Sequence, residues 1–125
     1  MTEAVIYHVC PAADWRQAEA AGKYTGSPGD RRDGFIHFST RDQVRTSTAI
    51  HRAAQDGLVL LTVDAVALGQ ALKWEPSRGG QLFPHLFGPL PVSAVTKAVA
   101  IPLGADGVHQ FPPGFPVSDT DSQQN

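Results

Sequence analysis

The chain of 125 residues has little cysteine, no long apolar run and no excess of charge of one sign. Its single cysteine, Cys10, excludes an internal disulfide and a cysteine-rich zinc site. No apolar run is long enough to span a bilayer, and the opening residues MTEAVIYHVC lack the basic and apolar regions of a secretory signal. We therefore expect a cytoplasmic protein with no membrane partner.

The formal net charge of −2 leaves no broad positive field for nucleic acid. Because non-specific nucleic-acid binding depends on such a field, a long nucleic acid is not an expected partner. Five of the ten Lys and Arg residues nevertheless fall between Arg31 and Arg52, where three aspartates partly cancel them. This segment is interpreted first as a solvated helix face and second as a local anion-binding patch. Nothing in the composition indicates the oligomeric state.

Strand-like composition occurs in four segments, and the most apolar of them predicts the middle of a sheet. The segments are AVIYHVC, GFIHFS, LVLLTVD and AVTKAVAI, rich in β-branched and aromatic residues. LVLLTVD is apolar on both alternating faces, which is typical of a strand buried on both sides. KWEP and LFPHLFG are predicted to be extended, because proline removes a backbone donor and restricts its neighbour.

Helix signals occur twice. Residues 14–22 begin with Asp14 as the predicted N-cap and Gln17 in position to reach back to it. Residues 40–57 begin with Thr40 and Gln43 in capping-box spacing and end at a glycine. The segment 25–34, TGSPGDRRDG, is predicted to be a loop from its Gly, Pro and Ser content.

The order of these elements is strand, helix, strand, helix and then mostly strands. A doubly wound sheet would need a helix at each later crossover, so that fold is excluded. We predict an α+β single domain over residues 1–104, built on a bent mixed or antiparallel sheet with two helices. Residues 105–125 form a Pro- and Gly-rich C-terminal tail that is expected to be partly disordered.

The sequence has no phosphate loop, dinucleotide glycine fingerprint, nucleophile elbow or metal-binding His-Glu-x-x-His helix. The candidate functional residues are instead polar side chains in apolar surroundings. They are His8 in IYHV, His37 and Ser39 in FIHFS, Glu75 in KWEP and His85 in FPHLF. A buried polar group without a partner costs about 1–3 kcal/mol, so each of them needs one.

Each candidate also has an ordinary structural explanation, such as a hydrogen-bonded core histidine or a surface carboxylate. A metal site is a further alternative, but the histidines are too scattered along the chain for typical ligand spacing, and no metal is expected. His51 and His109 are interpreted as structural or surface residues. Our prediction is that a bent sheet gathers His8, His37, His85 and an acid around one cleft.

The segments IYHV, GFIHFST, LVLLTVD, KWEP and GGQLFPHLFGPLPVSAV together resemble domain-of-unknown-function family nine-five-two. The resemblance covers about residues 4–101, and DGFIHFS and FPHLFGPLP are its most specific parts. The family is grouped by fold with the ADP-ribosyltransferase-like domains. The resemblance therefore implies a split, bent sheet with a nicotinamide dinucleotide cleft and NAD as a substrate. No established activity comes with the family.

Three strand positions carry the site in enzymes of that superfamily. The resemblance places His8 on a ribose hydroxyl or phosphate, and Ser39 with Thr40 in the nicotinamide pocket. Glu75 would stabilise the developing positive charge, although the Glu-x-Glu signature of the arginine-specific transferases is absent. Further expected contacts are a ring from Phe38, Phe35 or Tyr7 and a diphosphate clamp by Arg31 and Arg32.

Two classes of function remain open from the sequence. The first is an ADP-ribosyltransferase-like or 2′-phosphotransferase-like enzyme acting on NAD or another ADP-ribose-type nucleotide, with Glu75, His37 and His85 as catalytic residues. The second is a non-catalytic module that binds a nucleotide, a small anion or a protein. A relative that has lost its ligand and acts as a scaffold is a third reading. Fold similarity transfers poorly to activity, so the site must decide.

Overall fold

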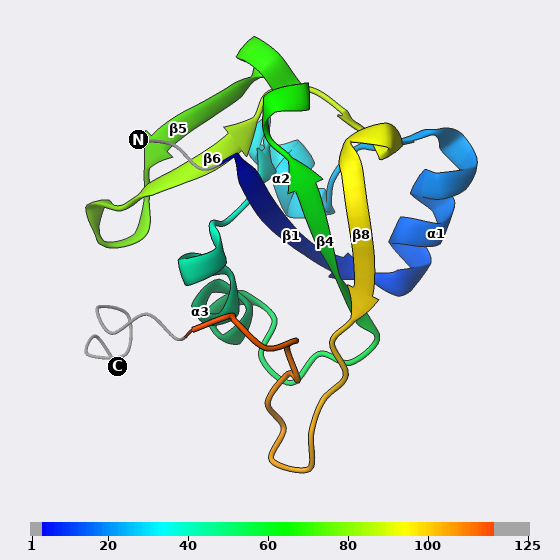
Figure 1. The fold of residues 1–125 in the computed structure, drawn as a ribbon, viewed down its shortest axis with the longest axis vertical. Helices are drawn as coiled ribbons and strands as arrows, with labels where there is room; N and C mark the ends of the chain where they lie inside the picture. Colours follow the sequence, from blue (N-terminus) through cyan, green and yellow to red (C-terminus); the bar gives the residue numbers. More distant parts are fainter. Residues whose placement is uncertain (1–3, 117–125) are drawn as a thin grey trace.

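The computed structural model describes residues 4–116. Its first three-stranded sheet has the order β1 (Val5–Pro11), β4 (Leu58–Asp64) and β8 (Val95–Ala100), with both pairings antiparallel (Figure 1). The apolar segment LVLLTVD forms the middle strand, as predicted. Both of its edges are paired, so its backbone donors and acceptors are satisfied inside the sheet.

A second three-stranded sheet has the order β3 (Ile36–His37), β6 (Leu82–Leu86) and β5 (Leu72–Pro76). β2 (Lys23–Tyr24) and β7 (Leu90–Pro91) form a separate short pair. Every pairing is antiparallel, and a bridge from Tyr7 to Ser39 links β1 to the residues after β3. The α+β class is confirmed. The predicted single sheet, however, is divided into three antiparallel sheets.

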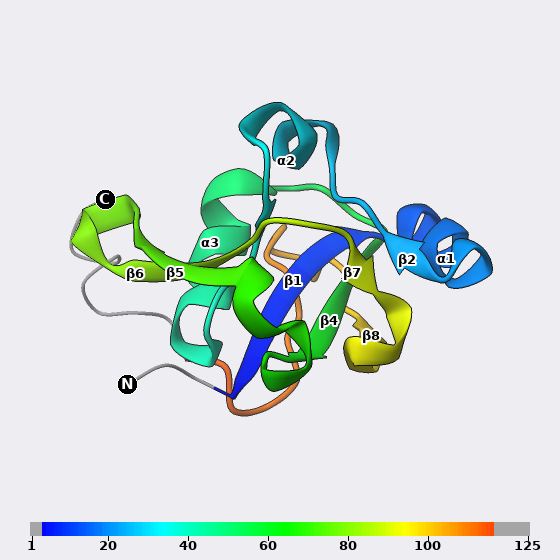
Figure 2. The ribbon, with the colours of Figure 1, turned by 90° about the horizontal axis from the view of Figure 1, so that it is seen from above.

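Three α-helices are present where two were predicted: α1 (Ala12–Ala21), α2 (Pro28–Asp33) and α3 (Arg41–His51). Figure 2 shows α2 and α3 on the same side of β1, with α1 apart from them near β2. The single turns η1 (Val66–Ala71), η2 (Arg78–Gly80) and η3 (Val92–Ala94) lie in the connections. None of the helices in residues 4–116 is long and apolar enough to cross a membrane.

Helix α2 corrects the loop predicted for residues 25–34. Ser27 Oγ accepts from the Asp30 backbone N–H at 3.1 Å, and Asp30 Oδ2 accepts from the Ser27 N–H at 2.8 Å. This reciprocal capping box, followed by Pro28 in the first turn, fixes the helix start. The Ser, Pro and Asp that indicated a loop therefore act as helix-start residues.

The ends of the other two helices confirm one prediction and correct two. α1 begins directly after Pro11 with no side-chain cap, so Asp14 lies inside the helix instead of capping it. At α3, Gln43 Oε1 accepts from the Thr40 backbone N–H at 3.0 Å, as the predicted capping box requires. That helix ends at His51, well before the glycine expected to end it.

The apolar core lies on both faces of β4, because its side chains alternate between two clusters. Leu61 and Val63 belong to the larger cluster, and Leu58 and Leu60 pack in a second one with Phe115. The Phe115 ring lies edge-on to Tyr7 with centroids 5.0 Å apart, so the chain packs against the domain well beyond residue 104. The last part of the predicted tail, 117–125, lies outside the described residues.

Candidate functional site

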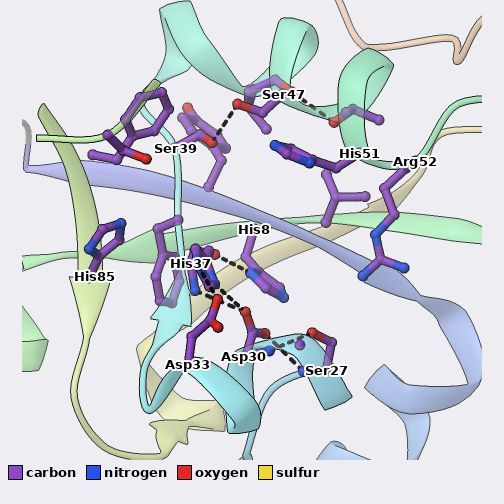
Figure 3. Close-up of a pocket in the computed structure, with 18 of the residues that line it drawn as sticks. His8, Ser27, Asp30, Asp33, His37, Ser39, Ser47, His51, Arg52 and His85 are labelled. Carbon is purple, nitrogen blue, oxygen red and sulfur yellow. Dashed lines mark hydrogen bonds and ion pairs between the residues drawn. The ribbon is translucent and has the colours of Figure 1, made fainter. Parts of the chain in front are cut away.

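A cleft of about 620 Å³ is bounded by α2, α3, β1 and the strands β3 and β6. The rings of His37 and His85 in its wall are 5.4 Å apart between centroids. His85 is buried, and it lines the cleft together with His37 and Ser39. Seven of the candidate residues line this cleft: Tyr7, His8, Arg32, His37, Phe38, Ser39 and His85. Figure 3 shows four of them, His8, His37, Ser39 and His85.

Strand register explains why two of the histidines meet. His37 of β3 is the direct cross-strand partner of His85 of β6, so the two side chains share one face of the sheet. Lys73 of β5 lies opposite His85, and Glu75, two residues further on, is on the same face. Glu75 Oε1 accepts a hydrogen bond from His85 Nδ1 at 2.7 Å. The pairing therefore sets a carboxylate and two imidazoles in a row.

His37 is held by two carboxylates of α2. Its Nδ1 donates to Asp30 Oδ1 at 2.6 Å, and its Nε2 lies 3.3 Å from Asp33 Oδ2. The hydrogen bond to Asp30 is the main reason that the pKa of His37 is raised above its usual 6.5, with burial opposing it. The charged imidazolium is the form that both carboxylates favour.

Asp30 is the buried member of this group, with 5% of its surface exposed. Burial on its own would raise the pKa of its carboxyl, but the hydrogen bonds from His37 and the Ser27 backbone, with the nearby His8, lower it to about 2. Asp30 therefore stays ionised across the physiological range. It ties helix α2 to β3 at the edge of the cleft.

His8 uses both of its ring nitrogens within the protein. Nδ1 donates to the His37 carbonyl oxygen at 2.6 Å, and Nε2 accepts from the Tyr24 hydroxyl at 2.9 Å. Burial lowers the pKa of His8, so the neutral ring is the stable form. A ligand that is to bind His8 through nitrogen must replace one of these two partners.

A cationic region in the wall of the cleft was predicted only in part: Arg52 belongs to the segment interpreted second as an anion-binding patch, whereas Arg78 was not expected there. The region consists of Ser47 and His51 of α3, the residue after that helix, Arg52, and Arg78 of η2, and all four line the cleft. Arg78 donates to Ser47 Oγ at 3.1 Å. Burial first, and then the charges of Arg78, His37 and Arg52, lower the pKa of His51, which indicates a positive potential at this point.

A helical pattern would have revealed most of this cationic region. Val44, Ser47, Thr48 and His51 recur at the i, i+3, i+4 and i+7 positions of one face of α3, Arg52 follows at i+8 directly after the helix, and all five line the cleft. The prediction treated His51 as a structural or surface residue because its immediate neighbours are polar. The helical spacing of these residues predicts their place in the cleft better than the polarity of their sequence neighbours does.

Four predicted residues, Arg31, Phe35, Thr40 and Glu75, do not line the cleft. Arg31 donates to the Gly26 carbonyl oxygen at 2.6 Å and supports the turn before α2. Thr40 caps α3, and Glu75 is bonded to His85 instead of facing the cleft. The expected pair of clamping arginines is thus reduced to Arg32, whose side chain is 77% exposed.

Aromatic rings cover the outer side of the two imidazoles. The Phe35 ring is stacked on His85 with centroids 4.2 Å apart and lies 4.6 Å from His37. Phe87 packs against Phe35 at 5.1 Å and is 41% exposed. This packing restricts the rotamers of both imidazoles. Among residues 4–116, no group of three or more His, Cys, Asp or Glu could hold a metal ion.

With this geometry in place, comparison with known proteins gives a family. The model of the family described as "Protein of unknown function (DUF952)" matches residues 9–98. The chain belongs to this family. The match spans all eight strands in part or in full and includes every candidate site residue except His8. No match is found among the curated proteins.

The chain is also similar to solved structures of protein CC0527 from Caulobacter crescentus. Its crystal structure matches with a TM-score of 0.82 and 48% identity, over 85% of this chain and 93% of that one. A double mutant of CC0527 gives a TM-score of 0.81 at 47% identity, with the same coverage. The solution NMR structure gives 0.77 at 47% identity, over 86% of this chain and 93% of that one. None of these descriptions states a function.

Proposed function

We propose that the cleft binds a phosphorylated nucleotide of the NAD or ADP-ribose type and that the protein acts on it as an enzyme. The observation that carries the proposal is the cationic region, where Arg52, Arg78 and His51 line one cleft with Ser47. Arginine guanidinium groups pair with phosphate through charge-assisted hydrogen bonds. A volume of about 620 Å³ lies within the roughly 300–1,000 Å³ typical of small-molecule sites.

The bonds of the carboxylates favour a 2′-phosphotransferase-like enzyme over an ADP-ribosyltransferase-like one. ADP-ribosyl transfer needs a carboxylate that faces the ribose to stabilise its developing positive charge. Glu75 is bonded to His85, and Asp30 and Asp33 are both engaged by His37. A 2′-phosphotransferase-like site, which needs cations and imidazoles around a phosphate, is therefore better supported by these side chains.

Calorimetry with ADP-ribose tests the binding proposal. The wild-type protein should bind it, and Arg52→Ala should weaken the affinity about tenfold or more, because a hydrogen bond to a charged group is worth about 1.5–3 kcal/mol. Arg16→Ala is the matched control, since Arg16 is exposed on α1 and does not line the cleft. Absence of binding to ADP-ribose, NAD and 2′-phosphorylated adenosine would contradict the proposal.

A non-catalytic nucleotide-binding module is the second candidate, and His8 favours it. Both nitrogens of His8 already have protein partners, so this residue contributes to packing as it stands. The module would bind the same nucleotide in the same cleft without converting it. Measurement of binding and turnover on the same samples separates the two candidates, and Glu75→Gln is the informative variant because it lies outside the cleft wall.

A further inference from the structure

Two histidines lie side by side in the cleft, and the Nδ1 of each is bonded to a carboxylate. The pairs are Asp30 with His37 at 2.6 Å and Glu75 with His85 at 2.7 Å. We propose that His37 and His85 are a general acid–base pair that hydrolyses a phosphodiester of a nucleotide bound in the cleft. This inference rests on the proposed nucleotide binding and adds the bond that is broken.

The arrangement meets the first requirement of such a pair, which is fixed mutual position. The two residues are direct partners on adjacent strands, with ring centroids 5.4 Å apart. Phe35 packs against both rings. At this separation both rings can reach atoms of a single reacting group through hydrogen bonds of about 2.6–3.2 Å.

The hydrogen bonds assign a different role to each ring. A carboxylate only accepts hydrogen bonds, so Glu75 holds a proton of His85 on Nδ1, and in the neutral ring the lone pair is then on Nε2. No described residue is bonded to that Nε2, and His85 lines the cleft. His85 is therefore the base. Glu75 acts through it as a positioning residue.

His37 is the acid, because both of its ring nitrogens lie against carboxylates, which stabilise its protonated form. Its Nε2 contact is the weaker one, at 3.3 Å from Asp33, whose side chain is 43% exposed. A phosphodiester entering the cleft can replace this exposed carboxylate while Asp30 keeps hold of Nδ1. His37 then presents Nε2–H to the substrate.

The reaction balances with water as the only co-reactant. The water oxygen forms a bond to phosphorus and its proton passes to His85 Nε2. The bond from phosphorus to the ribose oxygen breaks, its electron pair stays on that oxygen, and His37 Nε2–H supplies the proton. The product is a phosphate monoester, and the two histidines return to their starting states by exchanging one proton with solvent. The cationic region can stabilise the additional negative charge of the transition state.

The bonds of the carboxylates favour this chemistry over attack at a ribose carbon. Asp30 and Asp33, the carboxylates that line the cleft, both contact His37, and Glu75 contacts His85. Carboxylates bound to imidazoles set proton positions, as in other carboxylate–histidine pairs. A glycosidic cleavage would need one of them free against the sugar.

The test uses 2′,3′-cyclic AMP, with product followed by phosphorus NMR and affinity measured by calorimetry on the same proteins. The wild type should open the ring to adenosine monophosphate. His85→Asn and His37→Asn should each lower kcat about 100-fold or more, the usual contribution of general acid–base groups, with Kd within about threefold. Glu75→Gln should lower kcat about tenfold. Glu19→Gln, on the exposed face of α1 and away from the cleft, should leave it unchanged.

A positioning role for Glu75 also has a spectroscopic signature. Nitrogen NMR should show His85 protonated on Nδ1 in the wild type and partly on Nε2 in Glu75→Gln, a change that loss of a merely structural contact would not produce. His85 is buried, so the His85→Asn variant can fail to fold. In that case His37→Asn and Glu75→Gln test the acid–base pair, because the His37 side chain is 45% exposed and tolerates substitution better.

Each outcome decides a separate claim. Ring opening that depends on both histidines supports the pair. Ring opening at the wild-type rate in His37→Asn or His85→Asn overturns it. Binding of the cyclic nucleotide without ring opening overturns the pair and leaves nucleotide binding intact, which is the result expected of a non-catalytic module. Failure to bind 2′,3′-cyclic AMP, ADP-ribose or NAD overturns the proposed function together with this inference.

Discussion

The two three-stranded sheets share an antiparallel plan and differ in what their middle strands carry. β4 of the first sheet, LVLLTVD, places Leu58, Leu60, Leu61 and Val63 in the core. β6 of the second sheet, LFPHL, carries the buried His85 and pairs with a two-residue strand that ends at His37. One sheet stabilises the domain by apolar burial, and the other positions ionisable groups.

The comparison also shows where polar burial is tolerated. His8 is the imidazole that the first sheet buries; burial lowers its pKa and favours the neutral ring, and both ring nitrogens have hydrogen-bond partners. In the second sheet and α2, His37 and His85 are paired with carboxylates. Burial of a charge is strongly unfavourable unless it is paired, so this part of the domain can hold charged groups beside the cleft. Because the two sheets differ in this way, the stability of the domain and its ligand binding can be changed by separate substitutions.

The largest expected effect is on stability, in the first sheet. Leu61→Ala should lower the free energy of unfolding by about 2–5 kcal/mol, because it leaves a cavity in the core; Leu61 has 0% of its surface exposed. Folded molecules should keep the wild-type Kd for ADP-ribose. Denaturant unfolding and calorimetry measure the two quantities, and Val66→Ala, at a position 76% exposed, is the control that should change neither. A weaker affinity for ADP-ribose in folded Leu61→Ala protein would contradict the separate roles of the two sheets in stability and ligand binding.

A smaller effect is expected in the second region, where the contact between Asp30 and His37 should make stability depend on pH. The folded pKa of Asp30, about 2, is below its ordinary 3.8, so its contribution is present above 3.8 and is lost as the pH falls toward 2. The folded pKa of His37 is raised above 6.5, so its contribution is complete below 6.5 and is lost as the pH rises through the folded value. The contact should therefore stabilise the domain most between about pH 4 and 6.5.

Asp30→Asn sharpens this prediction. The variant should have a lower Tm than the wild type inside that window, by about 2–6 °C for a loss of about 1 kcal/mol in a domain of this size. The difference should shrink on both sides of the window. Thermal unfolding followed by circular dichroism from pH 2 to 9 measures it. A constant difference across this range would show that the contact between Asp30 and His37 is not the source.

Much of the site could be predicted from residues in unusual surroundings. His37 and His85 each lie between apolar residues, and a bent sheet was expected to gather them around one cleft. Their carboxylate partners were harder to find. Asp30 lies in SPGDRRDG, whose composition is that of a loop, and only the capping box turns it inward. Local composition does not reveal a partner that tertiary structure brings from another element.

The site assignments that came from the superfamily resemblance agree less well with the structure than those that came from the residues themselves. The resemblance assigned Glu75 to the ribose, yet cross-strand geometry bonds it to His85. It also pointed to Arg31 and Arg32, of which only Arg32 lines the cleft, and it did not point to Arg52 and Arg78, which line the cleft with Ser47. Arg78 lies in the turn after β5 and approaches α3 only once the sheet is folded, so no sequence pattern could place it there.

The central claim is that a phosphorylated nucleotide binds between the cationic region and the two histidines. Titration of isotope-labelled protein with ADP-ribose, followed by amide and imidazole chemical shifts, tests it most directly. The account predicts saturable shifts at His37, Ser47, Arg52 and His85, with the β8 residues unchanged. Shifts confined to other surfaces, or none at millimolar nucleotide, would contradict it.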